Sequence, residues 1–189
     1  HDFGREIFPA AIRTRRVQLH LFDGYWEDIG TIRSFYEANL MLAQANPPFE
    51  LASATAPIYS RARFLPPTRC DGATIERSLL ADGCVIGAGT RIENSVVGLR
   101  CRIGRDVTIR NSVIMGADFY ETPEQLAANS AANRPPIGIG EGSVVENAIV
   151  DKNARIGQGV RIVNHAGEAD RDGEGFYLRD GIVVVEKNA

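Results

Sequence analysis

Lysine is scarce in this sequence of 189 residues. Only two of the 21 basic residues are lysines, Lys152 and Lys187, and all the others are arginines. The two side chains differ in shape and hydration and are not interchangeable at a binding site. A chain that otherwise uses arginine therefore invites an explanation for its two lysines.

Cysteine and long apolar runs are also rare. Three cysteines, Cys70, Cys84 and Cys101, are too few and too odd in number for a disulfide framework, which favours a reducing compartment. No apolar run approaches the roughly 20 residues that a membrane span needs. The net charge of −3 gives no general attraction to nucleic acid or to an anionic membrane. We therefore expect neither nucleic acid nor a membrane as a partner.

From residue 75 onward, large apolar residues recur in steps of 5, 6 and 6 residues, a cycle of 17. These positions are Ile75, Leu80, Ile86, Ile92, Val97, Ile103, Ile109 and Ile114, and then, after an interruption, Ile139, Val145, Val150, Ile156 and Ile162. This spacing is too wide for the 3.6-residue period of a helix. It predicts a mostly β fold, a parallel β-helix in which each triangular coil points three side chains inward and stacks on the next.

Two further features belong to the repeat. The interruption at residues 116–137 predicts a long loop that leaves the coil at a corner. Glycine follows an inward residue at Gly87, Gly104, Gly140 and Gly157. We expect these glycines to occupy corners that need a positive φ.

Residues before the repeat have a different character. Residues 17–22 alternate between polar and apolar side chains, which predicts a strand. Thr31 is a suitable N-cap for a helix over residues 32–44. Two prolines follow this segment and would end the helix.

Long motifs spread over essentially the whole chain resemble glucose-1-phosphate adenylyltransferase (ADP-glucose pyrophosphorylase) of the cyanobacterial and plant type. The motifs include GYWEDIGT (24–31), RFLPP (63–67), MGADFYE (115–121), IVDKNARIG (149–157) and GIVVVEKNA (181–189). Motifs of this length are specific. The resemblance implies that the β-helix is left-handed, with hexapeptide-like coils, and that the C-terminal piece of an α/β nucleotidyltransferase domain precedes it.

The resemblance also implies a division of the chain. We assign residues 1–50 to the remnant of the catalytic domain and residues 51–72 to a connector. Residues 73–189 then form a left-handed β-helix domain for regulation and oligomerisation, with the loop at 116–137.

The implied reaction joins ATP and glucose 1-phosphate to give ADP-glucose and pyrophosphate, for glycogen or starch biosynthesis. Mg²⁺ offsets the negative charge of the reacting phosphates and is held by carboxylates. The resemblance assigns the catalytic and metal-binding role in this segment to Asp28, with Glu27 and Trp26 as neighbours on the sugar side. The alternative is that Asp28 only shapes a loop before the following helix.

The chain departs from the family in one large respect. The glycine-rich nucleotide loop, the base-reading residues and the other catalytic aspartate lie upstream in relatives, and the sequence has no counterpart of them. The start at His1 reads as a cut rather than a natural N-terminus. We therefore expect this chain to be the C-terminal portion of the enzyme and to be inactive by itself.

The two lysines match positions at which the family binds its sugar-phosphate activator. A ligand such as 3-phosphoglycerate needs charge-assisted donors, and Lys152 and Lys187 would supply them. Arg61 and Arg63 match positions that hold inhibitory phosphate, although many relatives carry Gln where this chain has Arg61. The alternative is that all four are solvated surface charges.

The resemblance implies a homo- or hetero-tetramer located in the cytoplasm, or in the plastid stroma of a plant or alga. Other β-helix proteins of this type are CoA-dependent acyltransferases or zinc hydratases, but their chemistry needs histidines and the repeat contains only His165. Two alternatives stay open. One is another sugar-1-phosphate nucleotidyltransferase, and the other is a non-catalytic β-helix subunit for regulation or assembly.

Two groups of residues carry weaker signals. Cys84 and Cys101 occupy equivalent places in adjacent coils, so we expect them to be neighbours that are reduced and packed rather than metal ligands. Asp118, Tyr120 and Glu121 lie where the predicted loop leaves the coil. They would face the catalytic domain or simply begin a surface loop.

Overall fold

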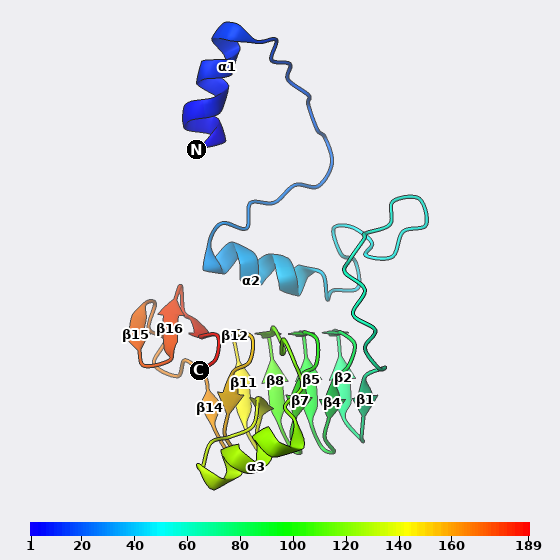
Figure 1. The fold of residues 1–189 in the computed structure, drawn as a ribbon, viewed down its shortest axis with the longest axis vertical. Helices are drawn as coiled ribbons and strands as arrows, with labels where there is room; N and C mark the ends of the chain where they lie inside the picture. Colours follow the sequence, from blue (N-terminus) through cyan, green and yellow to red (C-terminus); the bar gives the residue numbers. More distant parts are fainter.

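The computed structural model describes all residues from His1 to Ala189. Its N-terminal part consists of a π-helical turn (Phe3–Ile7), α1 (Phe8–Thr14), a long extended segment and α2 (Ile32–Met41). Figure 1 shows α1 standing apart from the rest of the molecule, whereas α2 lies along the stacked strands. None of the helices has the length and apolar character that crossing a membrane requires.

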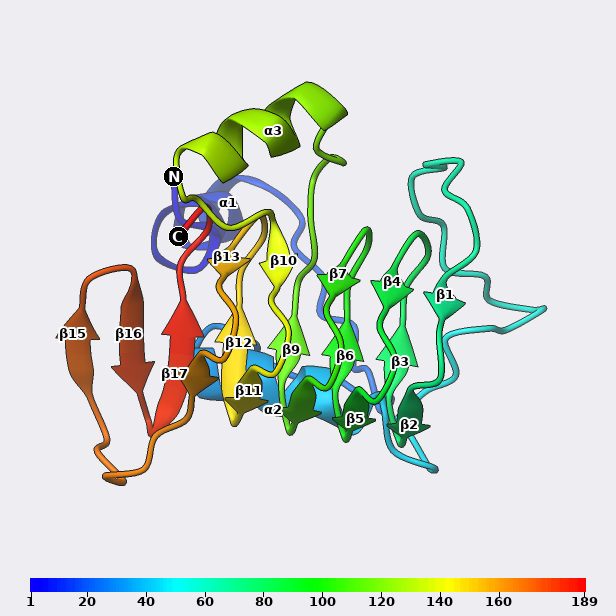
Figure 2. The ribbon, with the colours of Figure 1, turned by 90° about the horizontal axis from the view of Figure 1, so that it is seen from below.

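Five coils of short strands follow, and each coil gives one strand to each of three sheets. The first three coils are β1 (Arg69–Cys70), β2 (Thr74–Glu76) and β3 (Leu79–Leu80); β4 (Val85–Ile86), β5 (Arg91–Glu93) and β6 (Val96–Val97); and β7 (Arg102–Ile103), β8 (Thr108–Arg110) and β9 (Val113–Ile114). The last two are β10 (Gly138–Ile139), β11 (Val144–Glu146) and β12 (Ala148–Val150); and β13 (Arg155–Ile156), β14 (Arg161–Ile162) and β17 (Ile182–Val185). Figure 2 shows these coils stacked one after another along the axis of the β-helix.

Parallel pairing keeps one register from coil to coil. Ile86 pairs with Ile103, 17 residues later, and Ile103 pairs with Ile139 across the long loop. The predicted triangular coil, the parallel β-helix and the mostly β fold are therefore confirmed.

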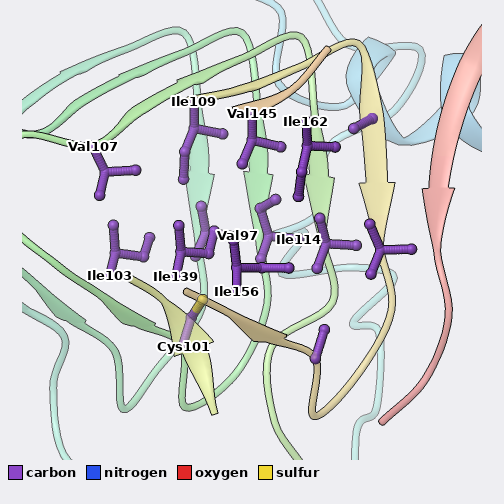
Figure 3. Close-up of a cluster of buried hydrophobic side chains, with 14 of the residues drawn as sticks. Val97, Cys101, Ile103, Val107, Ile109, Ile114, Ile139, Val145, Ile156 and Ile162 are labelled. Atoms are coloured by element: carbon purple, nitrogen blue, oxygen red, sulfur yellow. The ribbon is translucent and has the colours of Figure 1, made fainter. Parts of the chain in front are cut away.

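The core consists of the inward side chains, stacked in columns along the β-helix axis (Figure 3). Almost all the predicted inward residues are buried. The exceptions, Ile75 and Leu80, belong to the first coil and are only partly buried against this core. Coils of this kind bury their apolar side chains only against their neighbours, so the first coil, with one neighbour, buries them less completely.

α2 covers the outer face of the sheet that contains β9, β12 and β17. On that face Val113, Ile149 and Ile182 are buried and pack against Phe35 and Leu40, among other side chains of α2. In several strands of this sheet two adjacent residues are both apolar, and their side chains point to opposite faces of the sheet. These apolar pairs are the sequence signal of the second interface, between the sheet and α2. The capping box between Thr31 and Ser34 begins α2, as expected, but the helix ends at Met41 rather than at residue 44.

The four glycines that follow inward residues do not have positive φ values, so that expectation is wrong. Gly87, Gly104 and Gly140 are required instead because adjacent coils approach each other closely at these positions. A Cβ atom on Gly87 would lie 2.6 Å from the carbonyl oxygen of Gly104, and one on Gly104 would lie 2.7 Å from the backbone nitrogen of Glu141. At Gly157, in the last coil, the nearest atom would be 3.7 Å away.

Asparagines with positive φ occupy one corner of the coils instead. Asn94, Asn111 and Asn147 have φ values of 45°, 44° and 51°. The side-chain amide of Asn94 donates to Asn111 at 2.8 Å, and that of Asn111 donates to Asn147 at 3.2 Å. Gln44, just after α2, donates to the free end of this ladder at Asn94, so the ladder links α2 to the coils.

The predicted strand at residues 17–22 does not form. A strand needs a neighbour to supply hydrogen bonds, and no strand pairs with this segment, in which Leu19 is 88% exposed. The loop at residues 116–137 leaves the coil as expected and contains α3 (Pro123–Ala131). The division of the chain at residues 50 and 72 stays a prediction.

The third strand of the last coil was not predicted, because an insertion separates it from β14. The inserted residues contain β15 (Arg171–Gly173) and β16 (Phe176–Arg179), which form an antiparallel hairpin with β17. β17 then pairs with β12 in the register of the coils, and Val150 lies beside Val185.

The cysteines are unpaired, as expected. The backbone N–H of Val85 donates to the carbonyl oxygen of Cys101, which places Cys84 and Cys101 in adjacent coils. Both side chains are buried. Burial raises the pKa of both thiols, which keeps them protonated and suits packing rather than metal binding.

The close approach of the coils makes a prediction that two glycines can test. Gly104→Ala should lower the free energy of unfolding by about 1–3 kcal/mol, the usual cost of overpacking, because its Cβ would collide with backbone. Gly157→Ala is the matched control and should not destabilise the protein, because its Cβ has room. Urea unfolding of both variants and the unaltered chain measures the difference. Equal losses of stability in both variants would contradict the explanation.

Candidate anion-binding site

Lys152 and Lys187 lie side by side and share one carboxylate. The Nζ atom of Lys152 is 3.0 Å from Oδ1 of Asp118, and the Nζ atom of Lys187 is 2.9 Å from Oδ2. All three side chains are partly exposed to solvent, at 40% for Lys152, 50% for Lys187 and 38% for Asp118. The only two lysines of the chain therefore meet at a single point on its surface.

The register of the coils explains this meeting. Lys152 follows β12 by two residues and Lys187 follows β17 by two residues, and these strands are paired. The backbone N–H of Asn188 donates to the carbonyl oxygen of Lys152, which makes the two lysines equivalent positions of adjacent coils. Both lysines are followed by an asparagine with positive φ, Asn153 and Asn188, and these asparagines are hydrogen-bonded to each other at 3.1 Å.

Asp118 belongs to the same corner, one coil earlier, just after β9. Its backbone N–H donates to the Oδ1 atom of Asn153 at 2.8 Å, and its Oδ2 atom accepts a hydrogen bond from Nδ2 of Asn153 at 3.2 Å. Hydrogen bonds from Lys187 and Lys152 hold the pKa of Asp118 well below its usual range. The hydrogen bond with Asp118 raises the pKa of Lys187. Both shifts favour the ionised forms of Asp118 and Lys187 around neutral pH.

A cleft of about 510 Å³ opens beside this cluster. Arg61, Arg63, Arg100 and Lys152 line it, with Asp118 as its only acidic residue. The connector thus brings both arginines predicted for phosphate binding next to one of the two lysines. The excess of positive charge gives the cleft the donors that an anion with several oxygens needs.

Two residues of this cluster were not predicted to take part in it. Arg100 has a positive φ of 58° and donates to the carbonyl oxygen of Ala117. Asp118 was expected either to face the catalytic domain or to begin a surface loop. The motif that contains Asp118 and the 35-residue spacing of the lysines were visible in the sequence, but only the stacking register shows that they converge.

Asp28, Glu27 and Trp26 lie away from this cleft, in the exposed extended segment before α2. Oδ1 of Asp28 accepts a hydrogen bond from the backbone N–H of Gly30 at 2.9 Å, which shapes the turn that leads to Thr31. No group of three or more His, Cys, Asp or Glu side chains gathers in the molecule to hold a metal ion. Mg²⁺ is usually held by one or two carboxylates together with water and substrate phosphates, so the role of Asp28 as a metal ligand stays a prediction.

One contact connects the segment of Asp28 with the strand of Lys187. Arg33, in the first turn of α2, donates to the carbonyl oxygen of Asp180 at 2.8 Å and lies 3.7 Å from its carboxylate. Asp180 lies in the turn before β17, and Lys187 follows that strand. β17 thus runs from the turn that contacts α2 to Val185, two residues before Lys187.

A buried ion pair fixes the loop that begins near Asp118. Glu121 lies 2.7 Å from the guanidinium of Arg155, and their side chains are only 5% and 12% exposed. Glu121 also accepts hydrogen bonds from the backbone N–H of Ile137 at 2.7 Å and from Asn129 at 2.6 Å. These contacts join the start and the end of the loop around α3 and attach it to the coil.

Two families of known proteins match the sequence. The family described as the GLGC left-handed parallel beta-helix domain matches residues 63–189, which is more than half of the chain. The chain belongs to this GLGC β-helix family. The family described as Nucleotidyl transferase matches residues 1–45, the part that contains Asp28.

Membership of the GLGC β-helix family confirms the left-handed β-helix that the resemblance led us to expect. The two matches together place the chain in a family of sugar-phosphate nucleotidyltransferases. They name neither the sugar nucleotide nor the effector. The roles of Asp28, Glu27 and Trp26, and those of the lysines and arginines of the cleft, stay predictions.

The buried ion pair generates a prediction about stability and pH. Glu121→Gln should lower the free energy of unfolding by roughly 3 kcal/mol at pH 7, because it leaves Arg155 without its buried partner. Burial alone would raise the pKa of Glu121, but hydrogen bonds from Ile137 and Arg155 outweigh it and lower the pKa. The stabilisation is therefore fully present above the ordinary glutamate pKa of about 4.3 and is lost as the pH falls through the lower value in the folded state.

Urea unfolding between pH 3 and pH 7 tests this prediction. The difference between the unaltered chain and Glu121→Gln should be largest at pH 7 and shrink at the acid end. Glu50→Gln is the control, because Glu50 is exposed and makes no ion pair. A difference that does not change with pH would contradict the role of the ionised carboxylate.

Proposed function

We propose that this chain is the C-terminal, effector-binding part of a glucose-1-phosphate adenylyltransferase. The whole enzyme would make ADP-glucose and pyrophosphate from ATP and glucose 1-phosphate, in the synthesis of glycogen or starch. The motifs that resemble this enzyme support the proposal, and so do the matches to the GLGC β-helix domain and to nucleotidyl transferases. The β-helix would carry the activator site and contribute to assembly into a homo- or hetero-tetramer.

The observation that carries the proposal is the convergence of Lys152 and Lys187 beside a cleft lined by Arg61 and Arg63. An activator such as 3-phosphoglycerate has a phosphate and a carboxylate. The two ammonium groups would bind the phosphate through charge-assisted hydrogen bonds, each contributing about 1.5–3 kcal/mol. Arg61, Arg63 and Lys152 line the cleft together, and Lys187 lies beside it through its contact with Asp118.

The arginine side of the cleft suits an inhibitory phosphate. Arg61, Arg63 and Arg100 present planar guanidinium groups, which bind phosphate oxygens in pairs. Lys152 lines the same cleft and contacts Asp118 beside Lys187. Activator and phosphate would therefore compete for Lys152, which gives opposite regulation from one site.

Asp28 would contribute to catalysis by binding Mg²⁺ in the whole enzyme, with Glu27 and Trp26 beside the sugar. The bound metal would offset the charge of the reacting phosphates. Water and the phosphates of the substrates would supply further ligands, and the sequence has no counterpart of the glycine-rich nucleotide loop. We therefore propose that the chain alone does not turn over substrate. We also propose that the whole enzyme works in the cytoplasm or the plastid stroma.

Calorimetric titration of the purified chain with 3-phosphoglycerate tests the effector site. Lys152→Ala and Lys187→Ala should each weaken binding about ten- to hundredfold, because each removes a charge-assisted donor. Arg91→Ala is the control, because Arg91 is exposed on β5 and makes no ion pair. Equal affinity in all the variants would remove the assignment of the lysines.

The catalytic assignment needs an assay of its own. The chain alone should form no ADP-glucose from ATP, glucose 1-phosphate and Mg²⁺. Joined behind the catalytic part of a glucose-1-phosphate adenylyltransferase, it should give ADP-glucose formation that 3-phosphoglycerate stimulates and that Lys152→Ala makes unresponsive. Turnover by the chain alone would contradict the proposal. A joined enzyme with no response to the effector would favour a subunit for assembly only.

A further inference from the structure

Asp118 occupies the place that an effector anion would take. Its two carboxylate oxygens each receive one of the two lysine ammonium groups, at 3.0 Å and 2.9 Å. A phosphate that uses Lys152 and Lys187 together needs the same two donors. The site is therefore closed by a carboxylate of the chain itself when no ligand is bound.

The ion pairs of Asp118 are of a kind that a ligand can break. All three side chains are partly exposed, with Lys187 half exposed. Exposed ion pairs contribute little free energy because solvent screens them, whereas charge-assisted hydrogen bonds to a phosphate contribute more per donor. A phosphate also brings three oxygens and up to two charges, so it can replace one carboxylate on two ammonium groups.

We propose that Asp118 is an internal competitor for the effector, which sets the concentration at which an anion enters the site. This inference rests on the proposed function and adds to it the residue that opposes binding. The ligand displaces the Asp118 carboxylate from Lys152 and Lys187, and the carboxylate stays held by Asn153. Asp118 thus determines the threshold for activation without touching the reacting groups.

The opposite role would be that Asp118 positions the lysines for the ligand. The two roles predict opposite effects of removing the charge. Asp118→Asn keeps the size of the side chain and an oxygen that Asn153 can still reach. A competitor that loses its charge should let anions bind more tightly, whereas a positioning residue that loses its charge should let them bind more weakly.

The test is calorimetric titration of the full chain with inorganic phosphate and with 3-phosphoglycerate at pH 7.5. Asp118→Asn should bind both ligands about three- to tenfold more tightly than the unaltered chain, because one opposing charge and two exposed ion pairs are removed. Asp151→Asn is the matched control. Asp151 lies next to Lys152 and accepts a hydrogen bond from its backbone N–H at 2.6 Å, but makes no ion pair with either lysine. The charge of Asp151 also acts on Lys187 through space, so Asp151→Asn should change the affinity, but clearly less than Asp118→Asn.

The outcomes separate this inference from the function on which it rests. Weaker or unchanged binding to Asp118→Asn, with binding intact in the unaltered chain, overturns the inference and leaves the effector site standing. Binding that appears only in Asp118→Asn supports the inference, and binding in neither form overturns both proposals. Equal gains in Asp118→Asn and Asp151→Asn would show a general charge effect and overturn the competitor role. Should Asp118→Asn melt at a lower temperature, Asp118→Ser provides a second removal of the same charge.

Discussion

The close contact between stacked coils is the constraint on which the rest of this structure depends. At Gly87 and Gly104 the backbones of neighbouring coils approach so closely that no side chain fits between them. This contact and the parallel hydrogen bonds fix one register along the stack. The same register arranges the buried isoleucine columns, the asparagine ladder and the lysine pair. One geometric repeat therefore supplies both the core and the charged corner.

The sequence predicts the coils well because burial repeats at fixed intervals and each inward residue leaves its own signal. It fails where the answer depends on a partner. Residues 17–22 have the alternation of a strand, but nothing pairs with them. Gly87 and Gly104 were expected to occupy corners with positive φ. Their actual role, the close approach between coils, depends on residues of the next coil and cannot be recognised from the residues around each glycine. The last coil was incomplete, because the hairpin of β15 and β16 delays its third strand and hides the period.

The sequence identified the two lysines of the candidate site but could not predict how the residues of the site are arranged. Scarcity and a shared Lys-Asn-Ala context marked Lys152 and Lys187, and the coil register brings them together. The role of Asp118 depends on its contact with Lys152, which lies 34 residues away along the chain, beyond the loop that contains α3. Arg100 comes from yet another coil. A contact between residues of separate coils can be predicted only when the lengths of the insertions between the coils are known. These insertions do not follow the 17-residue repeat.

The lysine corner draws one group from each of three successive coils: Asp118 after β9, Lys152 after β12 and Lys187 after β17. In the last coil β13 and β14 pair with a strand on one side only, whereas β17 also pairs with β16 of the hairpin. An anion held by both lysines would bind only while the last coil is packed on its neighbour, so its binding free energy would add to the stability of the C-terminal interface. A regulatory ligand would thus also stabilise the last coil against local unfolding. Local unfolding of that coil would in turn remove the site, because it would separate Lys187 from Lys152.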